Sequence, residues 1–197
     1  MFNKPLGCIT ARRDERHATV MDYFPEEERS ILFPVGRLDK ETEGFLLVTD
    51  DGDLCFRLLR PEHHIPKSYF FVATGSLSND EIRLLEDGVK IYKNRDLITS
   101  PAKIEDVRAL TFADICEYLP EKERRMPERR AAMPACSGII TVTEGKKHQV
   151  RRMLRHVGCK IVHLKRIKMG KIPLDPSLPA GKYRPLTDEE LEILKNS

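Results

Sequence analysis

The 197-residue sequence lacks the patterns that mark several large classes of protein. No apolar run approaches the ~20 residues that a membrane-spanning helix needs, and no basic-then-apolar secretory pattern opens the chain. Glycine-rich loops of the Walker and dinucleotide-binding kinds are absent, as is any internal repeat of about 20–50 residues. We therefore expect a soluble, cytoplasmic protein that contacts no membrane and binds no nucleotide cofactor.

Disulfide and metal-binding patterns are also missing. The cysteines form no Cys-x-x-Cys pair and no even framework, so we expect reduced, mostly buried thiols at Cys8, Cys55, Cys116, Cys136 and Cys159. His63 and His64 have no cysteine or acidic partner at ligand spacing. A calcium loop centred on Gly52 would place leucines at its first and last ligand positions. The sequence thus predicts no metal site.

Charge is distributed unevenly, although the net charge is only +3. Acidic residues outnumber basic ones up to Arg60, whereas residues 144–171 hold ten Lys and Arg against one Glu. A block of one sign indicates a polyanionic partner such as a nucleic acid. On charge alone, a merely solvated lysine-rich face is an equal alternative.

Local patterns predict alternating strands and helices. Aromatic and β-branched residues indicate a strand over Lys67–Thr74, and Ser78 with Glu81 forms a capping box for a helix over Asn79–Asp87. The remaining expectations are helices at 20–24, 54–59 and after 187, strands at 45–48, 89–92, 101–107 and 138–143, and a charged, proline-rich loop at 120–134. This alternation predicts a fold that combines helices with strands.

The clearest helical pattern covers residues 146–157, where apolar residues repeat at i, i+3, i+4 and i+7 from Val150 to Val157. At about 100° per residue, three basic residues point away from that apolar stripe: His148, Arg152 and Arg155. Arg151 lies at the margin of the stripe. One helix thus offers a buried face, a basic face, and an arginine able to face a cleft.

Asp39 stands in the most informative segment, from Gly36 to Gly52. It directly follows Arg37-Leu38 on a tight loop, and the apolar strand after Gly44 fixes the far end of that loop. Such a loop can hold one carboxylate in place for chemistry. By position alone, an aspartate there is more often a simple turn former.

Three separated segments carry a family resemblance: Gly36-Arg37-Leu38-Asp39, Lys67-Ser68-Tyr69 and Gly145–Met153. Together they resemble the RNA pseudouridine synthases, in the RsuA-type branch that acts on ribosomal RNA. Three further segments resemble the small-subunit enzymes: 17–20, 61–64 and 180–187. Many relatives carry an N-terminal S4-type RNA-binding domain, whereas here the resemblance begins at the catalytic domain, so no S4 domain is expected.

The resemblance implies an α+β fold with a mainly antiparallel central sheet flanked by helices. The catalytic domain would span 1–197, as subdomains of approximately 1–61 and 62–197 with a cleft between them. It also implies site-specific isomerisation of uridine to pseudouridine in ribosomal RNA, with 16S RNA as the expected substrate and no cofactor. Asp39 would be the catalytic carboxylate, Tyr69 would stack on the base, and Arg151 would pair with Asp39. Whether the carboxylate attacks C1′ or removes a ribose proton stays open.

Seven residues are predicted to bind RNA: Arg37, Lys147, His148, Arg152, Arg155, Lys165 and Lys168. The expected partner is ribosomal RNA or a ribosomal assembly particle, bound by a monomer. Three alternatives stay open: a synthase for large-subunit 23S RNA, a non-catalytic ribosome-assembly factor, and a metal-dependent nuclease or phosphotransferase.

Overall fold

The computed structural model describes residues 1–92, 97–124 and 128–196. The chain divides into two compact units, and each is described here by itself. The first comprises Met1–Lys67 and Lys165–Ser197, and the second comprises Ser68–Leu164. The sequence predicted subdomains of approximately 1–61 and 62–197. In the structure Lys165–Ser197 groups with the N-terminal unit, because the strand that leads into this segment pairs with a strand of that unit.

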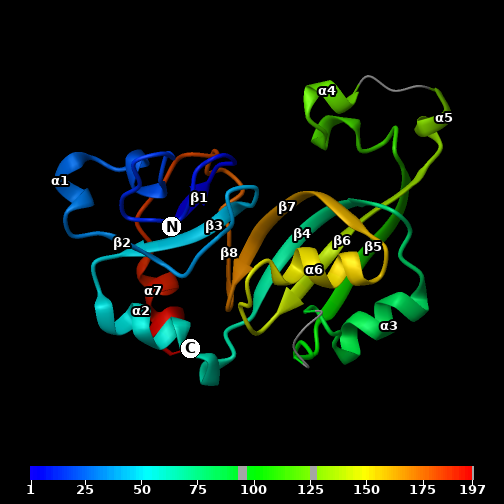
Figure 1. Cartoon of the computed structure of the whole chain (residues 1–197). Helices are drawn as coiled ribbons and strands as arrows, with labels where there is room; N and C mark the ends of the chain where they lie inside the picture. Colours follow the sequence, from blue (N-terminus) through cyan, green and yellow to red (C-terminus); the bar gives the residue numbers. More distant parts are fainter. Residues whose placement is uncertain (93–96, 125–127, 197) are drawn as a thin grey trace. The chain divides into compact units, whose positions relative to one another are not determined.

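Strands in the first unit are organised around β3 (Glu43–Thr49). β1 (Phe2–Lys4) and β2 (Phe33–Val35) both pair with it antiparallel. β7 (Lys160–Met169) pairs with it parallel, through Glu43 with Lys165 and Gly44 with Arg166. The short β8 (Ile172–Pro173) returns antiparallel to β7. β1, at the start of the chain, lies at one end of the strand order (Figure 1).

Helices of the first unit are short, and η1 (Val20–Tyr23), α2 (Gly52–Leu59) and α7 (Asp188–Lys195) begin at side-chain caps. The expected helix at 20–24 is the 3-10 turn η1, with Thr19 and Asp22 forming a capping box. α2 is capped by Asp51, whose side chain accepts from the Leu54 amide at 2.8 Å. The others are α1 (Glu26–Arg29) and η2 (Pro61–His63). Leu58 of α2 and Leu194 of α7 join Phe45 and Leu47 in one apolar core.

The second unit is a sheet in the order β7-β4-β6-β5, with β7 contributing its residues up to Leu164. Its other strands are β4 (Lys67–Thr74), β5 (Lys103–Thr111) and β6 (Pro134–Val142). The helices are α3 (Asn79–Asp87), η3 (Cys116–Tyr118), α4 (Glu121–Arg124), α5 (Glu128–Ala131) and α6 (Gln149–His156). Figure 1 shows α4 and α5 beyond one end of the β5–β6 pair.

Most local predictions are confirmed, with exceptions at 89–92 and 120–134. The strand Lys67–Thr74 and the helix Asn79–Asp87 have the predicted bounds. The strand predicted at 89–92 is wrong, since Lys90 forms only an isolated bridge with Ile98. The predicted loop 120–134 contains α4 and α5, and its residues 125–127 lie outside the described part.

The predicted fold class is confirmed: strands pair mostly antiparallel and helices accompany the sheet. No helix in the described ranges is both long enough and apolar enough to cross a membrane.

Substitution of Gly44 tests whether the β3–β7 pairing depends on the close approach of the Gly44 and Arg166 backbones. Its φ is +101°, and an added Cβ would overlap the carbonyl oxygen of Arg166 and lie 2.9 Å from the Arg166 nitrogen. Gly44→Ala should therefore lower the free energy of unfolding by about 2 kcal/mol or more, measured by urea denaturation. Gly52→Ala is the matched control, because a Cβ there meets nothing within 4 Å. Equal stability of the two variants would contradict the importance of this contact.

Candidate active site

Asp39 lies on the loop between β2 and β3 in the first unit. The preceding residue, Leu38, is buried, whereas Asp39 is half-buried and therefore still reachable from solvent. Gly36 turns the chain into the loop with φ +74°. The Thr42 amide donates to the Asp39 carbonyl oxygen at 3.0 Å and closes a turn around the carboxylate. The backbone on both sides of Asp39 is thus fixed locally.

The N-terminal segment holds the same loop from outside. The Thr10 hydroxyl donates to the Leu38 carbonyl oxygen at 2.8 Å and accepts from the Leu38 amide at 3.1 Å. The Gly7 amide donates to the Lys40 carbonyl oxygen at 2.9 Å. These contacts secure the residues immediately before and after Asp39, so they limit the freedom of its backbone.

Lys4 is a buried cation beneath this loop and was not predicted from the sequence. Its side chain is fully enclosed, and Nζ donates to the carbonyl oxygens of Thr42 at 2.9 Å and Pro5 at 3.0 Å. Burial lowers the pKa of Lys4, and nearby groups that include the Asp39 carboxylate oppose that shift. Lys4 therefore both braces the loop and contributes positive potential near the carboxylate.

Two further cations lie on the same unit. Arg166 is buried, and its Nε donates to the Phe45 carbonyl oxygen at 2.6 Å. Lys67 Nζ donates to the Ile65 carbonyl oxygen at 2.7 Å. Burial, followed by the charge of Arg166, lowers the pKa of Lys67 to about 8. Lys67 can thus gain or lose a proton much nearer neutral pH than an exposed lysine.

Tyr69 and Arg151, the other predicted catalytic residues, belong to the second unit. Tyr69 lies on β4 with only 9% of its surface exposed. Beside it, the hydroxyls of Ser68 and Thr141 are hydrogen-bonded at 2.8 Å across the β4–β6 pair. Arg151 is half-buried on α6. Its predicted pairing with Asp39 of the first unit stays a prediction.

Glu144 organises the start of α6. It accepts from the Ser100 amide at 3.0 Å and from the Gln149 side chain at 2.7 Å, and it forms an ion pair with Lys146. Burial raises the pKa of Glu144, but the hydrogen bonds from Lys146 and Ser100 outweigh it and leave the pKa lowered. His148, just before the helix, has a left-handed φ of 54°, so α6 begins at Gln149 rather than at the predicted residue 146.

A basic cavity of about 710 Å³ opens on the second unit, beside α6. It is lined by Lys90, Ile91, Tyr92, His148, Arg151, Arg152, Arg155 and His156. Four of these are predicted site residues: His148, Arg151, Arg152 and Arg155. The structure adds Lys90, Tyr92 and His156, which no sequence pattern connected to α6.

The other predicted RNA-binding residues do not line this cavity. Arg37 is exposed on the Asp39 loop, and Lys147 is exposed just before α6. Lys165 and Lys168 lie on the part of β7 that belongs to the first unit. Lys165 Nζ lies 3.7 Å from a Glu43 carboxylate oxygen, so part of its charge is already compensated. The predicted basic block is therefore divided between the two units.

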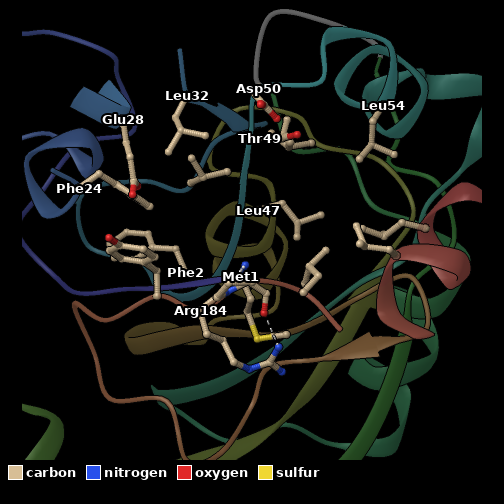
Figure 2. Close-up of a pocket in the computed structure, with 17 residues that line it drawn as sticks. Met1, Phe2, Phe24, Glu28, Leu32, Leu47, Thr49, Asp50, Leu54 and Arg184 are labelled. Carbon is tan, nitrogen blue, oxygen red and sulfur yellow. Dashed lines mark hydrogen bonds between the residues drawn. The ribbon is translucent and has the colours of Figure 1, made fainter. Parts of the chain in front are cut away.

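A second cavity, of about 380 Å³, lies within the first unit (Figure 2). Its walls include Phe2, Leu47 and Leu54, and the carboxylates of Glu28 and Asp50 also line it. Apolar walls and acidic groups do not suit a phosphate backbone, and Arg184, which also lines the cavity, is ion-paired with Asp175 and Glu190. We therefore do not assign RNA binding to this cavity.

Within the residues that the structure describes, no three His, Cys, Asp or Glu side chains are grouped to hold a metal ion. All five cysteines are free thiols, with Cys136 and Cys159 buried and their Sγ atoms 3.9 Å apart.

Similarity to known proteins identifies the class of enzyme. Residues 1–156 match the family model described as RNA pseudouridylate synthase. The chain belongs to this family. It is 43% identical over 198 residues to the "Uncharacterized RNA pseudouridine synthase YtzG" of Bacillus subtilis (strain 168), covering 98% of this chain and 72% of that protein. The sequence-based family assignment is confirmed, and the protein is an isomerase that modifies RNA.

Two further relatives support this family membership. The "Ribosomal small subunit pseudouridine synthase A" of Escherichia coli (strain K12) is 34% identical over 191 residues, covering 97% of this chain and 71% of that protein. A solved structure described as "Crystal structure of pseudouridylate synthase" superposes with a TM-score of 0.79 at 30% identity. It covers 98% of this chain and 71% of the solved one. The synthase fold therefore extends over nearly the whole chain.

The Thr10 anchor can be tested separately from catalysis. Thr10→Val keeps the shape of the side chain but removes both hydrogen bonds to Leu38, so it should destabilise the protein by about 1–3 kcal/mol. Hydrogen exchange at the Leu38 amide should also accelerate. Thr10→Ser retains the hydroxyl and should exchange like the wild type. Unchanged exchange in Thr10→Val would show that the hydroxyl does not hold the loop.

Proposed function

We propose that this synthase converts a specific uridine of small-subunit ribosomal RNA to pseudouridine, acting as a cytoplasmic monomer on the RNA or on an assembly particle. The small-subunit assignment is supported by the relative from Escherichia coli, whose name states that substrate class. The observation that carries the catalytic assignment is the half-buried Asp39 carboxylate on a loop anchored by Thr10 and Lys4. RNA binding alone requires no carboxylate fixed in this way.

The reaction needs one positioned carboxylate and no outside atoms. The C1′–N1 bond breaks, the uracil turns, and C5 bonds to C1′; C5 then loses a proton and N1 gains one, so the product is an isomer. Asp39 can attack C1′ directly or remove a ribose proton and return it, and it ends as a carboxylate by either route. Because no electron is gained or lost, no redox cofactor is required.

Tyr69 and Arg151 would support this chemistry from the second unit. The Tyr69 ring can stack on the uracil, and its hydroxyl can take part in moving the C5 proton. Arg151 would pair with the Asp39 carboxylate and orient it, because a guanidinium binds a carboxylate through two parallel hydrogen bonds. The target nucleotide must leave the base stack to reach either residue. These roles follow from the family motifs on which the residues lie.

Asp39→Asn tests the carboxylate. The substitution keeps the size of the side chain but removes its charge, so pseudouridine formation in small-subunit RNA should fall below about a thousandth of the wild-type rate. RNA affinity should survive. A turnover rate above a tenth of the wild-type rate would contradict the assignment of Asp39 as the catalytic carboxylate. A chelator added to the wild type is the control, and loss of activity there would favour a metal-dependent enzyme.

Arg151 and Tyr69 should affect the chemical step rather than binding. At saturating enzyme, the single-turnover rate of Arg151→Ala should fall by about a hundredfold or more, because the carboxylate loses the cation that orients it. Tyr69→Leu, which lacks the ring, should be slower than Tyr69→Phe. Lys147→Ala is the control, since it should weaken binding with little change in the saturated rate. A variant of Arg151 or Tyr69 that lost only affinity would place that residue in the binding surface.

The subunit assignment has its own test. Pseudouridines should be mapped in total ribosomal RNA from cells with and without this protein. Loss of one modified position in 16S RNA is expected. Loss of a position in 23S RNA would replace the small-subunit assignment with the large-subunit one.

A further inference from the structure

The basic cavity on the second unit has a composition suited to more than phosphate. Among the described residues that line it, none carries a carboxylate, and three arginines, one lysine and two histidines supply donors. Its volume of about 710 Å³ lies within the range of roughly 300–1,000 Å³ typical of small-ligand sites. A cavity of this size and charge can accept a nucleotide rather than a bare anion.

An aromatic ring and a guanidinium are in contact within this cavity. The Cζ atom of Arg152 lies 4.4 Å from the centroid of the Tyr92 ring, which is a cation–π geometry. Both side chains are half-buried, so packing holds them while part of each surface faces solvent. Proteins stack unpaired nucleobases on tyrosine rings and on arginine guanidinium groups.

Exposed cations lie around this pair. Lys90 precedes Tyr92 by two residues, while Arg155 and His156 stand at the end of α6, and all three are exposed. They can bind the phosphates that flank a base held on the Tyr92–Arg152 surface. Arg151, the predicted catalytic arginine, also lines the cavity.

We propose that this cavity is a subsite for one unpaired nucleotide of the RNA substrate, with the base stacked on Tyr92–Arg152 and its phosphates bound by Lys90, Arg155 and His156. The inference deepens the proposed function and rests on it, since the nucleotide would belong to the same RNA strand as the target uridine. Because Arg151 lines the cavity, this nucleotide would lie close in the strand to the uridine that Arg151 serves. Binding to Tyr92 would thus require the RNA beside the target uridine to be single-stranded.

The subsite can be tested by binding, without catalysis. All variants carry Asp39→Asn, and the probe is a single-stranded oligouridylate of about 10 nucleotides with one 2-aminopurine, scanned along its length. At one position the fluorescence should be quenched by stacking. Tyr92→Ala should abolish that quenching and weaken affinity by about 5-fold to 150-fold, the range expected for one lost base stack. Tyr92→Phe, which retains the ring, should behave like the parent.

Two comparisons separate stacking from simple charge attraction. Arg152→Lys keeps the charge but removes the planar surface, so it should lose most of the quenching. Arg83→Ala is the charge control, because Arg83 is on α3 with its side chain 78% exposed and does not line the cavity. It should leave quenching unchanged. An oligonucleotide lacking the base at the quenched position should bind parent and Tyr92→Ala equally.

The outcomes also separate this proposal from the proposed function. Equal affinity and equal quenching for the parent and Tyr92→Ala would overturn the subsite, whatever the activity of the enzyme. If Arg155→Ala bound more weakly while Tyr92→Ala had no effect, the cavity would bind only phosphate. That result would also overturn the subsite. If Asp39→Asn proved active, the catalytic proposal would fail while the quenching results would still decide the subsite.

Discussion

The close approach of Gly44 to the backbone of Arg166 is the constraint on which the rest of the first unit depends. No side chain fits between these residues, so β3 and β7 can pair parallel only with glycine there. That pairing brings the C-terminal segment back to the N-terminal unit. It also fixes the end of the loop that begins at Gly36 and carries Asp39. From that fixed end, the bonds from Lys4 and Thr10 need to secure only a few residues.

The loop is supported by buried positive charge, which is unusual for a structural role alone. Burying a cation is costly unless polar groups replace its water. Lys4 and Arg166 meet part of this need with backbone carbonyl oxygens rather than carboxylates. Their charge is therefore not cancelled by an adjacent anion in those bonds, and it adds positive potential to the unit that carries Asp39.

The elements with local sequence signals could be predicted. The helix Asn79–Asp87 was predicted to the residue because its capping box and Gly88 specify both ends. β7 was not predicted, because lysines and a buried arginine interrupt its apolar pattern. The loop anchors were missed since the Lys4–Thr42 and Thr10–Leu38 bonds join residues 38 and 28 positions apart. Asp39 could be chosen from its motif, whereas Tyr92 has no motif and approaches α6 only through the fold.

One helix of the second unit, α6, carries both the predicted catalytic arginine and part of the proposed nucleotide subsite. Successive residues of an α-helix point about 100° apart, so Arg151 and Arg152 line the same cavity from different directions. Arg152 contacts Tyr92, while Arg151 is left at the border of the apolar face. Glu144 holds the start of this helix through Ser100 and Gln149, and therefore sets the rotation of both arginines together. A substitution of Glu144 would therefore displace both Arg152 in the proposed subsite and the predicted catalytic Arg151. A substitution of Tyr92 would change only the proposed subsite. The positions of the two arginines are thus coupled through the backbone of α6, whereas their proposed roles can be tested separately by side-chain substitutions.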